Sequence, residues 1–142
     1  MNDLSFLLYR SETEMRPNSE AAGELLDSAR RVNAEQALSG FLHHEDGFFF
    51  QWLEGPAAAL DMVAGRMERD PRHHSLTYLW RGTQNDRQFG DWRMGYSSAA
   101  GSSILKWLAE HPVAQRERRA YAASVLAFLQ ERNAATEDQE AR

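Results

Sequence analysis

The sequence predicts an α+β fold, a ferredoxin-like β-α-β-β-α-β-β sandwich built on a five-stranded mixed sheet. Short apolar runs that favour strands alternate in this order with two stretches whose apolar residues repeat at helical spacing. The central run, residues 48–55 (FFFQWLEG), is apolar on both faces, so both faces of the sheet need a cover. We expect the two helices to cover one face and C-terminal helices to lie on or near the other.

The first elements are a strand and a helix. Residues 4–11 (LSFLLYRS) form an apolar strand, which is followed by a polar loop containing Pro17. Ser19 is a suitable N-cap for a helix that extends to about residue 32. The apolar face of this helix consists of Leu25, Leu26, Ala29 and Val32.

A hairpin joins the second strand to the third. Glu45, Asp46 and Gly47 form a tight-turn sequence between residues 40–44 (GFLHH) and residues 48–55. Pro56 then lies at the first turn of a second helix, where a missing N–H is tolerated. The apolar stripe of this helix consists of Leu60, Val63, Ala64 and Met67.

The second half of the chain adds two strands and a helical region. Residues 76–82 (LTYLWRG) predict the fourth strand and residues 92–98 (WRMGYSS) the fifth, with Trp92 and Met94 on one face. From Ser102 the pattern becomes helical, with a break at Pro112. The predicted organisation is a domain at 1–100, a helical extension at 101–132 and a flexible tail at 133–142.

Composition narrows the classes of function. The chain contains no cysteine, which excludes disulfides and zinc–thiolate sites. A net charge of −5 argues against nucleic acid as the main partner. No apolar run approaches the ~20 residues of a membrane span, and the first residues lack a secretory pattern. We therefore expect a soluble cytoplasmic protein.

The titratable residues predict neither a metal site nor an enzyme. His43 and His44 are neighbours in a strand, so they point to opposite faces and cannot share a metal ion. Glu45 and Glu54 flank the hairpin and a strand end, and we interpret them as turn and edge residues. No serine-nucleophile motif and no phosphate-binding glycine loop is present.

Several polar or functional side chains lie inside otherwise apolar elements. Gln51 shares a face of its strand with Phe49 and Leu53, and a buried amide without partners costs about 1–3 kcal/mol. Taken singly, Tyr9 and Trp92 are explained as core aromatics, Asn33 as a helix C-cap and Met94 as a gap filler. Their combination and spacing call for a further explanation.

Residues 4–98 resemble a BLUF domain, the flavin-binding blue-light sensor module, of the short stand-alone type with C-terminal helices. Five blocks in register carry the resemblance: LLYRS, NAEQALSGFL, FFFQWLEGP, RMERDPRHHS and FGDWRMGY. The resemblance implies noncovalent FAD, with FMN or riboflavin as substitutes, bound between the two helices. By the same resemblance the residues that contact flavin are Leu25 and Met67 on the ring faces, Asn33 and Gln51 on its edge, and Arg66, Asp70 and His73 toward the ribityl and phosphate end.

The resemblance also implies a mechanism. Tyr9 supplies an electron and a proton when flavin absorbs blue light, and Gln51, which bridges Tyr9 and flavin, is left rearranged. Trp92 and Met94 would pass this change through the fifth strand to the C-terminal helices, and from there to an unknown signalling protein or within a homo-oligomer, of which a dimer is favoured. Val32 and Ala29 replace residues that are often polar or hydroxylated in the family, which affects possible contacts at the ring edge.

Two alternatives stay open from the residues alone. The chain could be a light-insensitive module that uses the same slot for another small planar ligand. It could instead be a small ferredoxin-like enzyme of the acylphosphatase or monooxygenase kind, although it lacks a paired arginine–asparagine phosphate loop.

Overall fold

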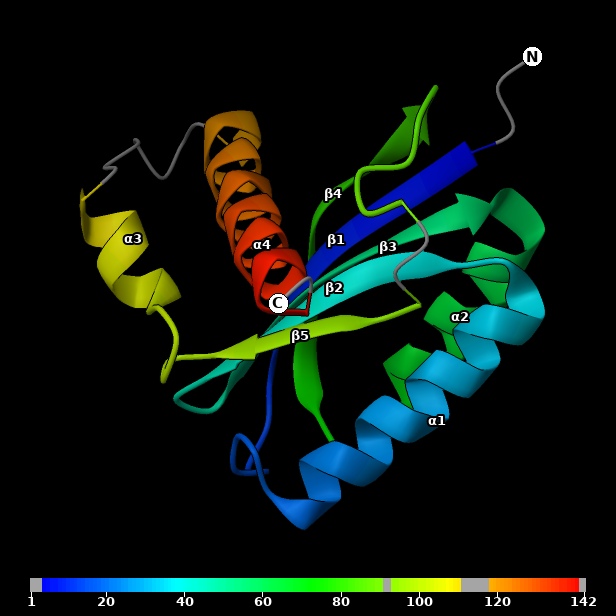
Figure 1. The fold of residues 1–142 in the computed structure, drawn as a ribbon. Helices are drawn as coiled ribbons and strands as arrows, with labels where there is room; N and C mark the ends of the chain where they lie inside the picture. Colours follow the sequence, from blue (N-terminus) through cyan, green and yellow to red (C-terminus); the bar gives the residue numbers. More distant parts are fainter. Residues whose placement is uncertain (1–3, 91–92, 111–117, 141–142) are drawn as a thin grey trace.

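A five-stranded sheet forms the centre of the molecule (Figure 1). The computed structural model describes residues 4–90, 93–110 and 118–140. The strands are β1 (Leu4–Glu12), β2 (Ser39–Glu45), β3 (Phe48–Pro56), β4 (His74–Gln84) and β5 (Gly95–Ser98), in the spatial order β4-β1-β3-β2-β5. The β2–β5 pair is parallel and the other pairs are antiparallel, so the predicted mixed sheet is confirmed.

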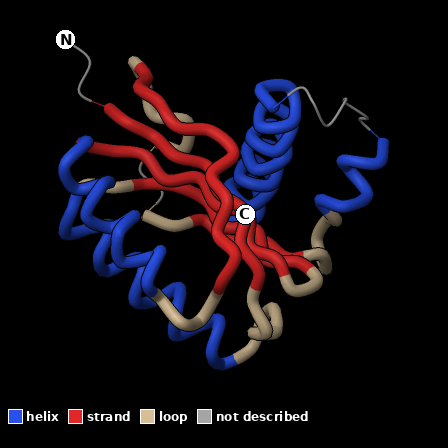
Figure 2. Tube along the Cα trace, turned by 180° about the vertical axis from the view of Figure 1, so that it is seen from behind, coloured by secondary structure: helices blue, strands red, loops and turns tan. Residues whose placement is uncertain are grey.

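Helices cover both faces of this sheet. The helices α1 (Glu20–Gln36) and α2 (Ala57–Arg69) lie together on one face. The long helix α4 (Arg118–Glu140) crosses the opposite face, and the short helix α3 (Ile104–Glu110) lies beside it beyond the end of β5 (Figures 1 and 2). The expectation that C-terminal helices cover the second face is therefore confirmed.

Strand alternation produces two separate apolar cores. On the α4 side, Trp52 stacks on Phe6 with ring centroids 4.5 Å apart, and Phe128 and Leu129 of α4 belong to the same cluster. On the α1–α2 side, the core includes Leu7, Tyr9, Phe49, Leu53 and Met94. Because β3 contributes buried residues to both cores, its apolar character on both faces is explained.

The first helix is longer than its apolar stripe indicates. Ser19 caps it as predicted, since its hydroxyl accepts the Ala22 N–H, but the helix continues to Gln36. The C-cap is Ala37, whose φ of 58° is left-handed. Asn33 is thus not the C-cap; it lies inside the last turn, with its side chain buried.

The start of β5 and the course of α4 also differ from the sequence prediction. β5 begins at Gly95 instead of residue 92, so Met94 precedes the strand, and Trp92 lies outside the described residues. The predicted break at Pro112 also lies outside them. α4 runs through Asn133, which is buried, so the helix does not end where the tail was expected to begin, while the division into domain, extension and tail stays a prediction.

The helices of the described segments are also informative about membranes. None of them combines the length and the apolar character that a bilayer-spanning helix requires.

Candidate functional site

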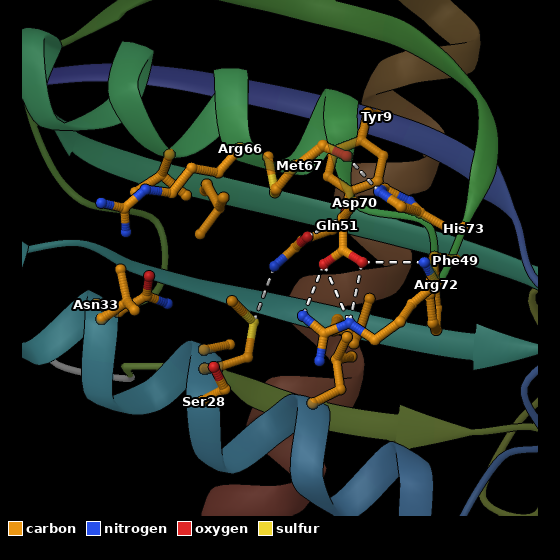
Figure 3. Close-up of a pocket in the computed structure, with 17 residues that line it drawn as sticks. Tyr9, Ser28, Asn33, Phe49, Gln51, Arg66, Met67, Asp70, Arg72 and His73 are labelled. Carbon is orange, nitrogen blue, oxygen red and sulfur yellow. Dashed lines mark hydrogen bonds and ion pairs between the residues drawn. The ribbon is translucent and has the colours of Figure 1, made fainter.

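A cavity of about 300 Å³ lies between the sheet and the helices α1 and α2 (Figure 3). This volume is at the lower end of the range of about 300–1,000 Å³ typical of small-molecule sites. Every cofactor-contacting residue expected from the sequence lines it. The lining consists of Tyr9, Leu25, Ser28, Ala29, Val32, Asn33, Leu42, Phe49, Gln51, Leu53, Val63, Arg66, Met67, Asp70, Arg72, His73 and Met94.

The floor of the cavity carries a hydrogen-bonded chain of three side chains. The antiparallel register of β1 and β3 sets Tyr9 opposite Gln51, and both side chains point to the face that α1 and α2 cover. The Tyr9 hydroxyl donates to Gln51 Oε1, and Gln51 Nε2 lies 3.3 Å from Met94 Sδ, to which it donates. The buried amide that the sequence left unexplained thus has one partner at each end.

Tyr9 is held as a neutral phenol. Burial raises its pKa, and the nearby Tyr78 and Asp70 raise it further because they disfavour a second negative charge. Tyr9 therefore keeps its proton across the physiological pH range, and that proton remains directed at Gln51.

Asn33 connects the cavity to the segment before β5. Its amide N–H donates to the backbone carbonyl of Arg93, while the side chain also lines the cavity from α1. Arg93 in turn donates from its guanidinium to the Leu38 carbonyl at 3.1 Å. The entry into β5 is therefore fixed to the end of α1 by side-chain contacts.

The expected phosphate-end residues do not act as one group. Asp70 and Arg72 form an ion pair with N–O distances of 2.6–3.1 Å. The hydrogen bond from Arg72 lowers the pKa of Asp70, and Asp70 raises that of Arg72. Arg66 instead points away from this pair, toward the Asn33 end of the cavity (Figure 3).

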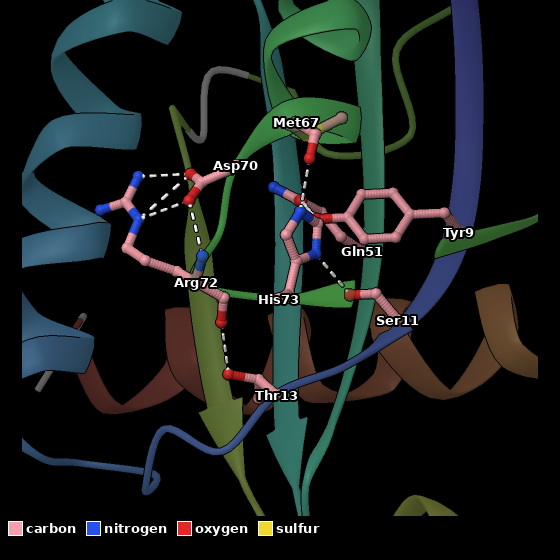
Figure 4. A network of polar contacts seen from close by, with 8 residues as sticks. All are labelled: Tyr9, Ser11, Thr13, Gln51, Met67, Asp70, Arg72 and His73. Carbon is pink, nitrogen blue, oxygen red and sulfur yellow. Dashed lines mark hydrogen bonds and ion pairs between the residues drawn. The ribbon is translucent and has the colours of Figure 1, made fainter. Parts of the chain in front are cut away.

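His73 has protein partners at both ring nitrogens (Figure 4). Its Nε2 lies 2.6 Å from the carbonyl of Met67, which can only accept, so Nε2 carries a proton. Nδ1 lies 2.7 Å from the Ser11 hydroxyl. These bonds position the ring at the end of the cavity, 5.9 Å from the Tyr9 ring, and do not leave it directed at a phosphate.

Sequence reasoning missed two polar residues of the lining, Ser28 and Arg72. Ser28 lies on the same helical face as Leu25 and Val32, so helical spacing could have found it. For Arg72, the only signal in the sequence was a cationic residue two positions after Asp70, a predicted site residue. Its place at the cavity depends on Asp70 and on the Thr13 hydroxyl, which donates to the Arg72 carbonyl at 2.7 Å.

The cavity has the chemistry that a flavin requires. Apolar side chains of two facing helices, including Leu25 and Met67, flank a slot suited to a flat ring. The amides of Asn33 and Gln51 offer both donors and acceptors to a polar ring edge. Two guanidinium groups also line the cavity, Arg66 toward Asn33 and Arg72 in its ion pair with Asp70. The residues present therefore fit the ring of a flavin.

Comparison with known proteins agrees with this chemistry. The BLUF family model, described as sensors of blue light using FAD, matches residues 4–95. The chain is 34% identical over 87 residues to the photoactivated adenylate cyclase subunit beta of Euglena longa, covering 61% of this chain and 10% of that protein. It is 31% identical over 87 residues to the blue light- and temperature-regulated antirepressor BluF of Escherichia coli (strain K12), covering 61% and 22%.

Solved structures share the fold. The dark-state structure of BlrB, a BLUF protein, superimposes with a TM-score of 0.73 at 24% identity, covering 91% of this chain and 99% of that one. BlrP1 of Klebsiella pneumoniae has a TM-score of 0.65 at 27% identity, covering 86% and 32%. The family match spans β1 to the start of β5, which includes every residue that lines the cavity. The chain therefore belongs to the BLUF family, the sensors of blue light that use FAD.

Proposed function

We propose that this protein senses blue light through the hydrogen-bonded side chains of Tyr9, Gln51 and Met94. A rearrangement of these bonds is transmitted through β5 to the C-terminal helices. As a BLUF domain, it is a flavin-binding blue-light photoreceptor and not one of the small ferredoxin-like enzymes. The observation that carries the proposal is the Gln51 amide, which is hydrogen-bonded to Tyr9 at one end and to Met94 at the other.

Bound flavin supplies the absorption of blue light and, once excited, a strong oxidant. Tyr9 is the electron donor in the proposal, because it is a buried phenol that lines the flavin cavity. Oxidation of a phenol makes its proton strongly acidic. Gln51 Oε1 already accepts that hydrogen bond, so the proton has a path out of the phenol.

Gln51 is suited to keep a rearranged set of hydrogen bonds after light absorption. The two ends of a carboxamide are similar in size and opposite in hydrogen-bonding character, so a turned amide fits the same space with inverted contacts. Before the change, Nε2 donates to Met94 Sδ, and sulfur can only accept. A turned amide presents Oε1 to the sulfur and loses that bond, so Met94 is released at the entry to β5.

FAD is the proposed flavin, with FMN or riboflavin as substitutes, because the matching family is described as sensors of blue light using FAD. Arg66 at the cavity suits a phosphate group, whereas the guanidinium of Arg72 is already paired with Asp70. Riboflavin, which lacks phosphate, should therefore bind more weakly than FAD. Leu25 and Met67 are assigned to the ring faces, and Asn33 to the polar ring edge.

The output is proposed to be a contact with another protein or a change within a homo-oligomer, of which a dimer is favoured. The chain spans only about a tenth of the cyclase relatives and about a fifth of the antirepressor, so the activities named for those proteins do not transfer. The C-terminal helices, which pack on the sheet face opposite the cavity, are the proposed route to such a partner.

A visible spectrum of the purified protein with FAD tests the proposal. The parent should be yellow and should show a small, reversible red shift under blue light. Tyr9→Phe should keep FAD bound and lose the red-shifted state, because the phenyl ring fills the same space without a donor. Tyr78→Phe is the matched control, since that hydroxyl donates to Glu68 at 2.9 Å and does not line the cavity.

Two results would contradict the proposal. If Tyr9→Phe cycles like the parent protein, Tyr9 is not the donor. If the purified chain is colourless and refuses added FAD, the alternative of another planar ligand in this cavity is favoured instead.

A further inference from the structure

The face of the sheet opposite the cavity contains a buried polar pair for which light sensing as described has no use. His43 is fully buried in β2, and Glu45, two residues along the same strand, is 1% exposed. His43 Nε2 lies 2.7 Å from Glu45 Oε1. Burying a histidine and a carboxyl group is costly unless every polar atom has a partner. The identity of those partners shows what the pair connects.

On one side the pair binds β5. His43 Nδ1 lies 2.7 Å from the hydroxyl of Ser97, which stands beside His43 in the parallel β2–β5 ladder. Because Nε2 donates its proton to the carboxylate, Nδ1 accepts the proton of the Ser97 hydroxyl. Ser97 is three residues after Met94, so it lies on the short strand that Met94 introduces.

On the other side the pair binds the start of α3. Glu45 Oε1 accepts the backbone N–H of Ile104 at 2.7 Å, and Oε2 accepts that of Leu105 at 3.4 Å. The Ser103 hydroxyl also donates to Oε2, at 2.5 Å. Burial on its own raises the pKa of Glu45, but the bonds from His43, Ser103 and these two amides outweigh it and lower the pKa. Glu45 is therefore an ionised cap of this helix.

The helix α4 covers the His43–Glu45 pair with an aromatic side chain. The Phe128 ring packs edge-on against the His43 ring with centroids 4.8 Å apart. The same phenyl ring meets Trp107 of α3, with centroids 5.8 Å apart. Both C-terminal helices thus contact the pair, directly or through one aromatic ring, while β5 contacts it through one hydroxyl.

We propose that His43 and Glu45 are the positioning residues that convert a displacement of β5 into a change at the first turn of α3. When β5 shifts, Ser97 moves and the His43 imidazole follows it through their hydrogen bond, so Glu45, bonded to the same ring, is pulled from the Ile104 and Leu105 amides. This inference rests on the proposed function, since it takes the Met94 end of β5 as the part that light displaces.

Ser97→Ala removes the contact with β5 and leaves the Glu45 cap intact. The FAD-loaded full chain is examined in darkness and under blue light, with the absorption spectrum and backbone amide hydrogen exchange read from the same sample. In the parent, light should speed exchange at Ile104 and Leu105. In Ser97→Ala the red shift and the dark exchange rates at these amides should remain within about twofold of the parent, while the light-induced difference is lost.

Two further variants separate coupling from simple support. Ser98→Ala removes the neighbouring hydroxyl, which accepts from Asn18 Nδ2 at 3.1 Å away from the pair, and should keep the parent response. Ser97→Thr retains the hydroxyl and should restore the light-induced difference. A merely structural role for Ser97 would change dark exchange and leave the light-minus-dark difference in place.

The possible failures are distinguishable. The inference is overturned if Ser97→Ala keeps the parent's light-induced difference, or if the parent shifts its absorption with no change at Ile104 and Leu105. A parent without any red shift overturns the proposed function itself, and the signalling role of the pair with it.

Discussion

At the scale of single residues, the site depends on groups whose hydrogen-bonding character is fixed next to one whose character can invert. The Tyr9 hydroxyl keeps its proton because of burial, and the Met94 sulfur can only accept. Gln51 lies between them with a donor at one end and an acceptor at the other. A reorientation of this amide therefore changes partners without a change in volume, which makes it a suitable switch.

Met94→Leu tests the sulfur contact. The substitution conserves volume, so the free energy of unfolding should change by less than about 1.5 kcal/mol. In the dark arrangement, the substitution removes the weak N–H···S bond from Gln51 to Met94, whereas the turned amide makes no such bond. The dark arrangement is therefore destabilised by ~0.6 kcal/mol relative to the red-shifted state, and thermal return from that state should slow about threefold. Absorption recovery after a blue pulse measures this, and an unchanged rate would show that Met94 does not bias Gln51.

At the scale of elements, close backbone contacts fix the strands that carry the site. β2 approaches β3 so closely at Gly40 that a Cβ there would lie 2.0 Å from the backbone carbonyl oxygen of Trp52. Glu54 at the end of β3 is fully buried and accepts the backbone N–H groups of Gln88 and Phe89 at 2.7 and 3.0 Å. The turn that leads toward β5 is thus fixed to β3, the strand of Gln51.

Two glycine substitutions should have opposite effects. Gly40→Ala should lower the free energy of unfolding by about 3 kcal/mol or more, because the obstructing atom is backbone and cannot rotate away. Gly23→Ala, in α1 with no atom within 4 Å of the added Cβ, should raise it by about 0.5–1 kcal/mol through helix propensity. Urea unfolding of both variants measures the difference. A tolerated Gly40→Ala would contradict the β2–β3 approach described above.

At the scale of the whole molecule, the buried titratable groups predict loss of stability in acid. Burial is the largest cause that lowers the pKa of His43 and His44 below the ordinary value of 6.5; hydrogen bonds to Glu45 and Met15 partly oppose it. The unfolded chain therefore binds more protons than the folded one once the pH falls below about 6.5. The pKa values of Glu45 and Asp70 are also lowered, so protonation of these two carboxylates decreases the free energy of unfolding further at more acid pH.

The free energy of unfolding should accordingly be constant between about pH 7.5 and 9 and should fall as the pH drops from about 6.5 to 5. Each histidine contributes at most about 1.4 kcal/mol per pH unit. Urea unfolding at a fixed, saturating FAD concentration measures the profile. His44→Gln should make it shallower, whereas His74→Gln, at an exposed position, should not. A flat profile between pH 7.5 and 5 would show that the two buried histidines do not titrate as inferred.

Some of the site could be read from the chain alone, because local backbone geometry places it. The two-residue period of a strand puts Gln51 on the face of Phe49 and Leu53, and helical spacing puts Leu25 and Met67 on apolar stripes. The family motifs predicted a bound flavin and the residues around it. These residues line the cavity between α1, α2 and the sheet.

The remaining features of the site depend on contacts between segments far apart in the sequence, which local sequence patterns do not predict. Glu45 and Glu54 were interpreted as turn and edge residues, yet both are buried, since their hydrogen-bond donors come from the start of α3 and from the turn after β4. The register that sets Tyr9 opposite Gln51 likewise follows from strand pairing. The sequence by itself determined which face each residue occupies, because backbone periodicity is local; only the tertiary structure decided which residues meet across those faces, because register and packing depend on the whole chain.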